Sequence, residues 1–325
     1  MHKSIKLLLV SLAICSAVFL TAFLGRNILL LESSNNGNVF LVRATLVLKA
    51  QVDARDKRGW APLMYAIKRK HLDVAKVLLD HGANVNVQEP KNLFSPMYLA
   101  AYAGDIRSIS LLSENGANIN ALDKDGATPL FGAMTWRRYE AVKALLERHA
   151  DPNAGVLAGE PALFCAIEKD DSAIVAMLLQ HQVQVNLLDS IGVTALSRAV
   201  FNGNLPIIKL LLAHGVEVNG RNRDGKTPIF FAVMHNDTGL VSYLIREKAN
   251  VNAQDLRGLT PLMHAANKRN SDVMEILLRN GADPYLESTT GHDVRDLIMG
   301  MNDFKLALLL NRYVKSGQGS VKNKQ

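Results

Sequence analysis

The sequence predicts an all-α fold, a solenoid in which similar helix pairs are stacked one after another. The first observation is a short phrase that returns along the chain, with complete copies at Thr128-Pro129-Leu130, Thr227-Pro228-Ile229 and Thr260-Pro261-Leu262. The second is its spacing. The apolar residue that closes each complete or worn copy falls at Leu63, Met97, Leu130, Leu163, Leu196, Ile229 and Leu262, so the gaps are 34 and then five times 33 residues. A fixed period in this range is typical of a solenoid.

The last full copy shows why each unit should form two helices. Gly258 lies in a turn where a positive φ is needed, Thr260 can cap the first helix, and Pro261 occupies its first position, where no N–H is required. The second helix presents apolar side chains at helical spacing, and Gly281 follows as a C-terminal cap. The recurring asparagines mark the return to the next turn: Asn86, Asn120, Asn153, Asn186, Asn219 and Asn252.

In period and in its Thr-Pro-Leu phrase, this unit resembles the ankyrin repeat. The resemblance covers residues 37–313 and implies an ankyrin-repeat solenoid of paired antiparallel helices with β-hairpin-like turns, about seven full repeats plus terminal caps. We expect an N-terminal cap over 37–54, repeats over about 55–285 and a C-terminal cap over 286–313. Terminal repeats are expected to be atypical because each has one neighbour. Residues 314–325 are polar and contain three lysines, which predicts a disordered basic tail.

Residues 1–30 predict a signal peptide or an N-terminal membrane anchor. Lys3 and Lys6 precede an apolar stretch from Leu7 to Leu24, whose 18 residues are just long enough to cross a bilayer. An uncleaved anchor, a cleaved signal and lipidation at Cys15 all remain open. Each alternative places the repeats outside the cytosol, either anchored to the inner membrane or secreted to the periplasm.

Composition agrees with an exported solenoid. The chain has 325 residues, two cysteines and a net charge of +7. Cys15 lies in the apolar leader and Cys165 in a repeat helix, so no intrachain disulfide is expected and helix stacking must provide the stability. The charge is a mild bias toward acidic partners and does not indicate nucleic acid.

No catalytic or metal-binding motif is present, so we expect no enzyme activity, no cofactor and no metal. His81, His181 and His214 share one column of the repeat, just before the glycine that ends the second helix. A cation at a helix C-terminus is favoured by the helix dipole, which explains the column without a metal. Cys165 has no neighbouring histidine in the aligned columns and is expected to be a small core residue.

The resemblance also indicates where a partner would bind. In the family, the ligand-facing columns flank the turn glycine and lie near the end of the first helix. Tyr, Trp and Arg dominate binding hot spots, although an aromatic here could instead pack between repeats. The residues of these types that we expect to bind a partner are Arg58, Trp60, Arg69, Tyr102, Trp136, Arg137 and Phe201.

The expected function is therefore a non-enzymatic protein–protein interaction module facing the bacterial envelope. It would bind one protein partner with acidic and apolar surface, and inhibit or chaperone it. An immunity factor against a secreted toxin or lipase is one example implied by exported proteins of this type. The alternatives are a scaffold or regulator of a periplasmic enzyme and, more remotely, a metal-binding or enzymatic solenoid.

Overall fold

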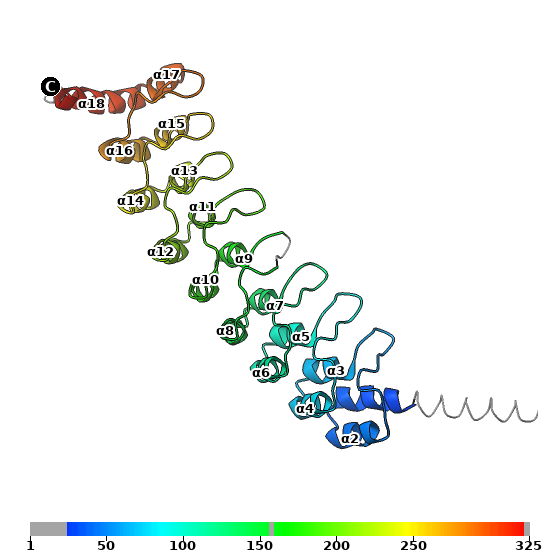
Figure 1. Ribbon diagram of the computed structural model, residues 1–325. Coiled ribbons are helices and arrows are strands. Elements are labelled where there is room, and N and C mark those ends of the chain that lie inside the picture. The colour runs from blue at the N-terminus through cyan, green and yellow to red at the C-terminus, as the bar shows by residue number, and fades with distance from the viewer. Residues whose placement is uncertain (1–24, 156–158, 322–325) are drawn as a thin grey trace, which may run out of the picture. The chain divides into compact units, whose positions relative to one another are not determined.

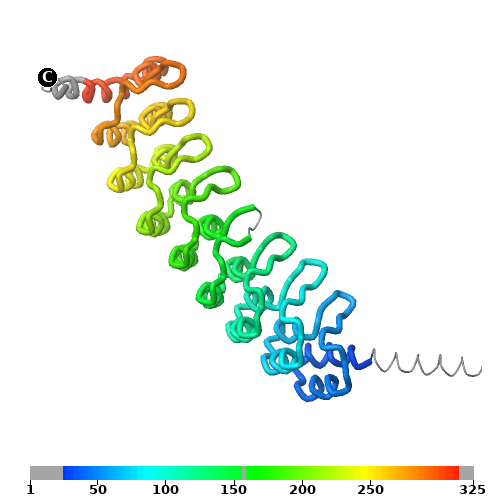
Figure 2. The backbone as a smooth tube through the Cα atoms, viewed as in Figure 1, coloured from blue at the N-terminus to red at the C-terminus, as the bar shows by residue number. Residues whose placement is uncertain are grey.

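The computed structural model describes residues 25–155 and 159–321, and the chain divides into two compact units, Met1–Ala158 and Gly159–Gln325. Each unit is a series of antiparallel helix pairs joined by loops (Figure 1). This confirms the all-α solenoid of repeated helix pairs. Within each unit the long loops between successive pairs project to the same side (Figure 2).

Unit 1 begins with helical residues 25–36, which precede α2. Its named helices are α2 (Val39–Val47), α3 (Pro62–Lys68), α4 (Leu72–Asp80), α5 (Pro96–Ala103), α6 (Ile106–Glu114), α7 (Pro129–Thr135) and α8 (Tyr139–Glu147). The first helices of successive pairs contact each other, α3 with α5 and α5 with α7. The second helices, α2, α4, α6 and α8, form a parallel series of contacts.

Unit 2 repeats this arrangement. Its first helices are α9 (Ala162–Glu168), α11 (Ala195–Phe201), α13 (Pro228–Met234), α15 (Pro261–Asn267) and α17 (Val294–Gly300). Its second helices are α10 (Ser172–Leu179), α12 (Leu205–Ala213), α14 (Thr238–Arg246), α16 (Ser271–Arg279) and α18 (Phe304–Val321). Again each helix contacts its own partner and the equivalent helix of the neighbouring pair.

The recurring phrase places the core. Its closing apolar residue is fully or almost fully buried in every copy, from Leu63 to Leu262. Ala199, Ala265 and Ala266 are fully buried where two helices approach, which small side chains permit. Phe131 and Phe230 are the largest of the buried side chains, and burial of each stabilises the fold by about 1.5–3 kcal/mol relative to exposure.

The recurring asparagines tie each repeat to the next through the backbone. In unit 1 the side-chain oxygen of Asn86 accepts a hydrogen bond from the Asn118 amide at 2.7 Å. In unit 2 Asn219 does the same for the Asn250 amide at 2.7 Å, and Asn252 for the Asp283 amide at 2.8 Å. A short amide side chain at this position therefore fixes the spacing between consecutive repeats.

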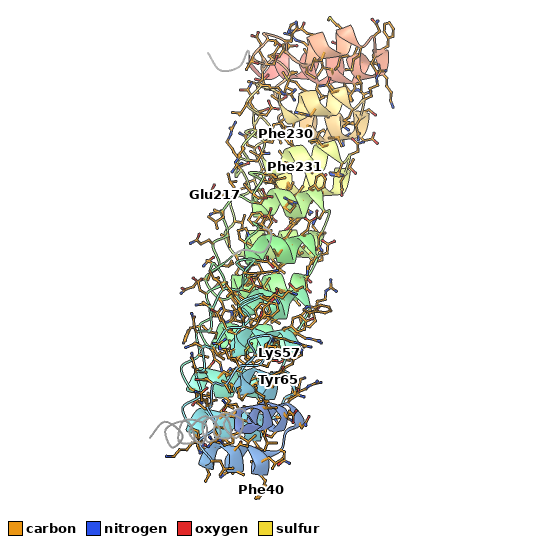
Figure 3. The ribbon with its side chains drawn as sticks, turned by 90° about the vertical axis from the view of Figure 1, so that its right-hand side faces the viewer. Phe40, Lys57, Tyr65, Glu217, Phe230 and Phe231 are labelled. Carbon is orange, nitrogen blue, oxygen red and sulfur yellow. The ribbon has the colours of Figure 1, made fainter. Side chains whose placement is uncertain are left out.

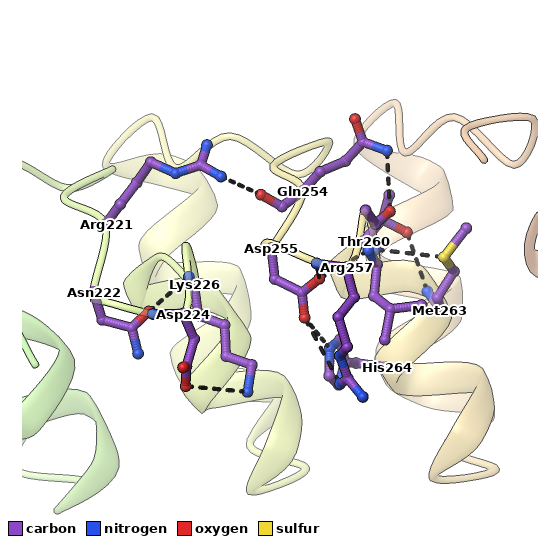
Figure 4. Close-up of polar contacts among 12 residues, drawn as sticks. Arg221, Asn222, Asp224, Lys226, Gln254, Asp255, Arg257, Thr260, Met263 and His264 are labelled. Carbon is purple, nitrogen blue, oxygen red and sulfur yellow. Dashed lines mark hydrogen bonds and ion pairs between the residues drawn. The ribbon is translucent and has the colours of Figure 1, made fainter. Parts of the chain in front are cut away.

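Each turn is closed by one acidic or amide side chain at its start. The Asp255 carboxylate accepts hydrogen bonds from the amides of Arg257 and Leu259, both at 2.9 Å, and lies 3.4 Å from His264 Nε2 (Figure 4). Gly258 has φ +71°, and a Cβ there would lie 2.8 Å from the Thr289 amide nitrogen of the next turn. Glycine is thus required both for its conformation and for the close approach of the loops.

The structure differs from the expected boundaries at both ends. A helix covers residues 25–36, ahead of position 37, and its Leu30 is fully buried. At the other end α18 continues to Val321, where a disordered tail had been expected from residue 314. The expected β-hairpin-like turns are loops that form no strand in the described residues, with an isolated β-bridge between Leu188 and Thr194.

The apolar leader from Leu7 to Leu24 lies outside the described residues. Among the helices of the described part, none combines the length and the apolar character needed to cross a bilayer.

Threonine at the first-helix N-cap has two outcomes in unit 2. The Thr260 hydroxyl accepts a hydrogen bond from the Met263 amide at 3.2 Å, whereas the Thr227 hydroxyl is buried without a hydrogen-bond partner. We expect Thr260→Val to lower the free energy of unfolding by about 1 kcal/mol. Thr227→Val should leave it unchanged or raise it slightly, because an unsatisfied hydroxyl is replaced by a methyl of similar shape. Denaturant unfolding of both variants tests this, and equal losses would contradict it.

His264 should make unit 2 sensitive to mild acid. Burial lowers the pKa of His264 below its ordinary value of 6.5, against the opposing effect of Asp255. The unfolded chain therefore binds a proton more readily than the folded chain, so stability is full above pH 6.5 and falls as the pH drops below it. Lys226 and Arg257 act in the same direction as burial. In thermal unfolding, His264→Gln should show a weaker loss of stability below pH 6.5 than the unmodified chain. Identical pH profiles would refute this assignment.

Candidate partner-binding surface

The seven residues expected to bind a partner are distributed over both units. Unit 1 contains Arg58, Trp60, Arg69, Tyr102, Trp136 and Arg137, and unit 2 contains Phe201. All are exposed except Trp60, which is half-buried. The structure groups them into an exposed aromatic pair and a basic cleft in unit 1, and a separate aromatic contact in unit 2.

The aromatic pair of unit 1 consists of Tyr102 and Trp136. Tyr102 lies near the end of α5 and Trp136 directly after α7, and their rings meet edge to face with centroids 5.3 Å apart. Tyr102 is 43% exposed and Trp136 is 52% exposed. Arg138 reaches across the same junction, and its Nε donates to the Tyr102 carbonyl at 3.4 Å. The pair is therefore positioned by two repeats while much of both rings remains accessible.

Arg137 follows Trp136 in a left-handed conformation, with φ +51°. This conformation ends α7 and lets the chain turn into α8 at Tyr139. Its amide donates to the Met134 carbonyl at 3.0 Å, which fixes the backbone at this point. The exposed Arg137 is thus held beside the aromatic pair by the helix end itself.

A basic cleft lies at the start of unit 1. It has a volume of about 500 Å³, and it is formed by the helix 25–36, the first turn and α3; its lining residues are Asn35, Asp56, Lys57, Arg58, Tyr65, Lys68 and Arg69. A second cleft of about 630 Å³ shares Lys57 and Arg58 and extends to Trp60, Glu89 and Lys91. Figure 3 shows Lys57 and Tyr65 close together in this region. The clefts bring Arg58 and Arg69 together with cations that were not among the expected site residues.

Trp60 is held between these clefts by packing. Its ring lies 5.3 Å from that of Tyr65 and packs against buried Met64 and Val87, and Lys68 Nζ lies 4.7 Å from the centre of the indole. One part of the ring therefore belongs to the junction between repeats. The remaining part forms the wall of the second cleft.

The carboxylate of the basic cleft is neutralised by local donors. Asp56 accepts hydrogen bonds from the amides of Arg58 and Trp60, both at 2.8 Å, and from the Tyr65 hydroxyl at 2.6 Å. Burial opposes its ionised form, but these bonds outweigh burial and lower the pKa of Asp56 below 3.8. Burial and the contact with Asp56 raise the pKa of Tyr65 to about 12. Because Asp56 is used within the turn, the four cations of the cleft give it a net positive charge.

Phe201 forms its own contact in unit 2. It lies at the end of α11 and meets His235, which directly follows α13, with ring centroids 4.8 Å apart and nearly perpendicular. The two residues occupy the same repeat positions as Tyr102 and Trp136. The same two columns thus place rings in contact in each unit.

Sequence reasoning found Arg58 and Arg69 but did not include Lys57, Lys68, Lys91 or Asn35 among the site residues. Lys57 and Lys68 lie in ligand-facing columns and could have been included on charge. Lys91 lies in the one repeat with a 34-residue spacing, which obscures its alignment. Asn35 belongs to a helix that the repeat pattern did not reveal.

The histidine column forms helix caps. The Nδ1 atoms of His81, His181 and His214 lie 2.8, 2.8 and 2.9 Å from the carbonyl oxygen four residues earlier. Asn115 and Asn280 make the equivalent bond with amide nitrogen, so the column requires a donor and not specifically histidine. Among the described residues no three histidine, cysteine or acidic side chains are grouped as a metal site would require.

Cys165 is half-buried and its thiol lies 3.7 Å from the Glu160 carbonyl. Burial, together with the negative charge of Glu160, raises the pKa of Cys165 to about 11. The side chain is therefore a neutral thiol at physiological pH, and a thiol is a poor nucleophile.

Comparison with known proteins agrees with the geometry. A family model described as "Ankyrin repeats (3 copies)" matches residues 1–89, 88–156, 155–222 and 216–288. An ankyrin repeat protein of Acanthamoeba polyphaga mimivirus is 31% identical over 100 residues, which is 31% of this chain and 13% of the viral protein. The human ankyrin repeat and KH domain-containing protein 1 is 36% identical over 106 residues, 32% of this chain and 4% of its own length.

An alpha-latrotoxin of Latrodectus hesperus is 30% identical over 102 residues, 31% of this chain and 7% of the toxin. This chain thus covers only a small part of each of these relatives, and the similarity concerns the repeats. Because the family model matches most of the sequence and the structure consists of the corresponding helix pairs, the chain belongs to the ankyrin-repeat family.

Proposed function

We propose that this protein is a non-enzymatic binding module for one protein partner, and that unit 1 carries the main contact surface. Ankyrin repeats are generally protein–protein interaction modules without catalytic activity. The observation that carries the proposal is the Tyr102–Trp136 pair, two large rings that touch each other and remain about half exposed. Large exposed apolar rings flanked by arginine are typical of binding hot spots.

The basic cleft supports a partner with acidic as well as apolar surface. Lys57, Arg58, Lys68 and Arg69 line one cleft whose carboxylate, Asp56, is already engaged by its own turn. A carboxylate of the partner could approach these cations and form charge-assisted hydrogen bonds with the arginines. The charge pattern would direct the partner to unit 1, and the aromatic pair would supply the apolar contact.

We further propose that the module faces the bacterial envelope and inhibits or chaperones its partner there. The basic leader and the apolar run Leu7–Leu24, which lie outside the described residues, support export. An immunity factor against a secreted toxin or lipase is the form of this role that we favour. Activity of the purified partner with and without this chain distinguishes inhibition from chaperoning.

Truncation of Trp136 tests the contact surface. We expect Trp136→Ala to weaken binding of the captured partner by about 2 kcal/mol or more, which is about 30-fold in Kd. Phe304→Ala is the matched control, because Phe304 is an exposed aromatic of α18 outside the ligand-facing columns. Calorimetric titration measures affinity, and circular dichroism checks the fold of both variants. Unchanged affinity of Trp136→Ala, or its unfolding, would show that Trp136 serves packing.

Topology is tested by reporter fusions after Gln325. Because Lys3 and Lys6 precede the apolar run, we expect a reporter that works only in the periplasm to be active and a cytosolic reporter to be silent. The same fusions with Lys3 and Lys6 replaced by glutamate serve as the control and should reduce export. The reverse pattern, with an active cytosolic reporter, would contradict the proposed location.

A further inference from the structure

The outer side of α2 carries an exposed apolar face. Phe40, Arg43 and Val47 are spaced by three and four residues, so they share one side of the helix. Phe40 is 78% exposed and Val47 is 79% exposed, and Leu48, directly after the helix, is 57% exposed. The opposite side buries Val42 and Thr45, and α2 packs on α4. Figure 3 shows Phe40 at the N-terminal edge of unit 1.

This face departs from the rule that the other repeats follow. The same three positions hold Asp73, Lys76 and Asp80 in α4, Glu140, Lys143 and Glu147 in α8, and Asp272, Glu275 and Arg279 in α16. None of the equivalent positions in α6, α10, α12 or α14 holds an aromatic, leucine, isoleucine, valine or methionine. An apolar face on α2 is therefore not a property of the repeat, and large exposed apolar side chains in one place indicate a binding surface.

The charges around this face are basic. Arg43 lies on the face itself, and Lys49 follows Leu48 and is exposed. Glu32 is the one acidic residue among positions 25–50, against Arg26, Arg43 and Lys49. Apolar side chains bordered by cations are the combination that binds the interface of a bilayer with anionic head groups.

The first turn of the helix 25–36 joins this face to the leader. The Arg26 guanidinium donates to the Leu48 carbonyl, and the Asn27 side chain accepts from the Gln51 amide at 2.9 Å. The apolar run ends at Leu24, two residues before Arg26. The end of α2 is therefore in hydrogen-bond contact with the residue that emerges next after the apolar run, and Phe40 lies about 10 Å further along the helix.

We propose that Phe40, Val47 and Leu48, with Arg43 and Lys49, lie on the surface of an anionic bilayer. The proposal rests on the proposed attachment through residues 7–24, and that attachment favours lipid over a second copy or another protein as the occupant. The apolar side chains would enter the boundary between head groups and acyl chains, and the two cations would contact the head groups. Unit 1 would thus be held against the bilayer by its own surface as well as by its leader.

The test places a fluorescent probe on the face in the full chain. Val47→Cys is labelled in a background with Cys15→Ser and Cys165→Ala, and Asp80→Cys, the same position in α4, is the matched control. The vesicles are phosphatidylcholine with phosphatidylglycerol, with nitroxide lipids as quenchers near the head groups. We expect lipid quenching to be several-fold stronger at position 47 than at position 80, and quenching by aqueous iodide to be weaker.

Two further arms test the chemistry. Phe40→Ser with Leu48→Ser should reduce lipid quenching at position 47 several-fold while the chain still floats with the vesicles. Phe304→Ser with Leu308→Ser removes exposed apolar side chains from α18 and should have no effect. Vesicles of phosphatidylcholine alone should weaken quenching at position 47, because Arg43 and Lys49 lose their anionic partners.

The outcomes separate this inference from the proposed attachment. A chain that floats with the vesicles but shows equal quenching at positions 47 and 80 overturns the inference and leaves the attachment standing. A probe at position 47 that is shielded from iodide but not quenched by lipid assigns the face to a protein, which also overturns the inference. A chain that does not float with either vesicle overturns both.

Discussion

A single helix pair of this chain cannot bury its own apolar face, and the rest of the structure depends on this constraint. Leu63, Leu196 and Leu262 are fully buried because each lies between its own pair and the next. A repeat that loses its neighbour exposes this face, so stability is shared along a unit. The asparagine column acts on the same junction, because Asn86 and Asn252 donate their side-chain oxygens as acceptors to the backbone of the following repeat.

The same constraint leaves the other surfaces free to differ. Columns that do not take part in stacking hold a ring pair at Tyr102 and Trp136, cations around Asp56, and an apolar face at Phe40 and Val47. None of these alters the helix pair that carries it. A stacked fold can therefore combine a partner-binding surface with a membrane-facing one on the same unit, because each repeat contributes side chains and not a separate scaffold.

Much of the candidate surface followed from repeat positions, and the remainder depended on contacts that have no repeat. The columns placed Tyr102 and Trp136 near helix ends, and their rings indeed meet. The columns could not show that Trp60 packs against Met64 and Val87, because burial at a junction depends on the shapes of both neighbours. Nor could they join Asn35 to Arg69, whose side chains lie 3.0 Å apart across 34 residues of sequence.

The sequence alone determined the period, the all-α class, the helix caps and the family, because each of these depends on local spacing: Gly258 must allow a positive φ, and Pro261 must begin a helix. Tertiary structure decided what lies at the ends and how the free columns are used. The helix at residues 25–36 and the extension of α18 to Val321 follow no repeat. Thr227 and Thr260 are the same residue in the same column, yet one hydroxyl caps a helix and the other has no hydrogen-bond partner. The physical reason is that local propensity is encoded residue by residue, whereas a contact depends on which neighbour the stack brings to it.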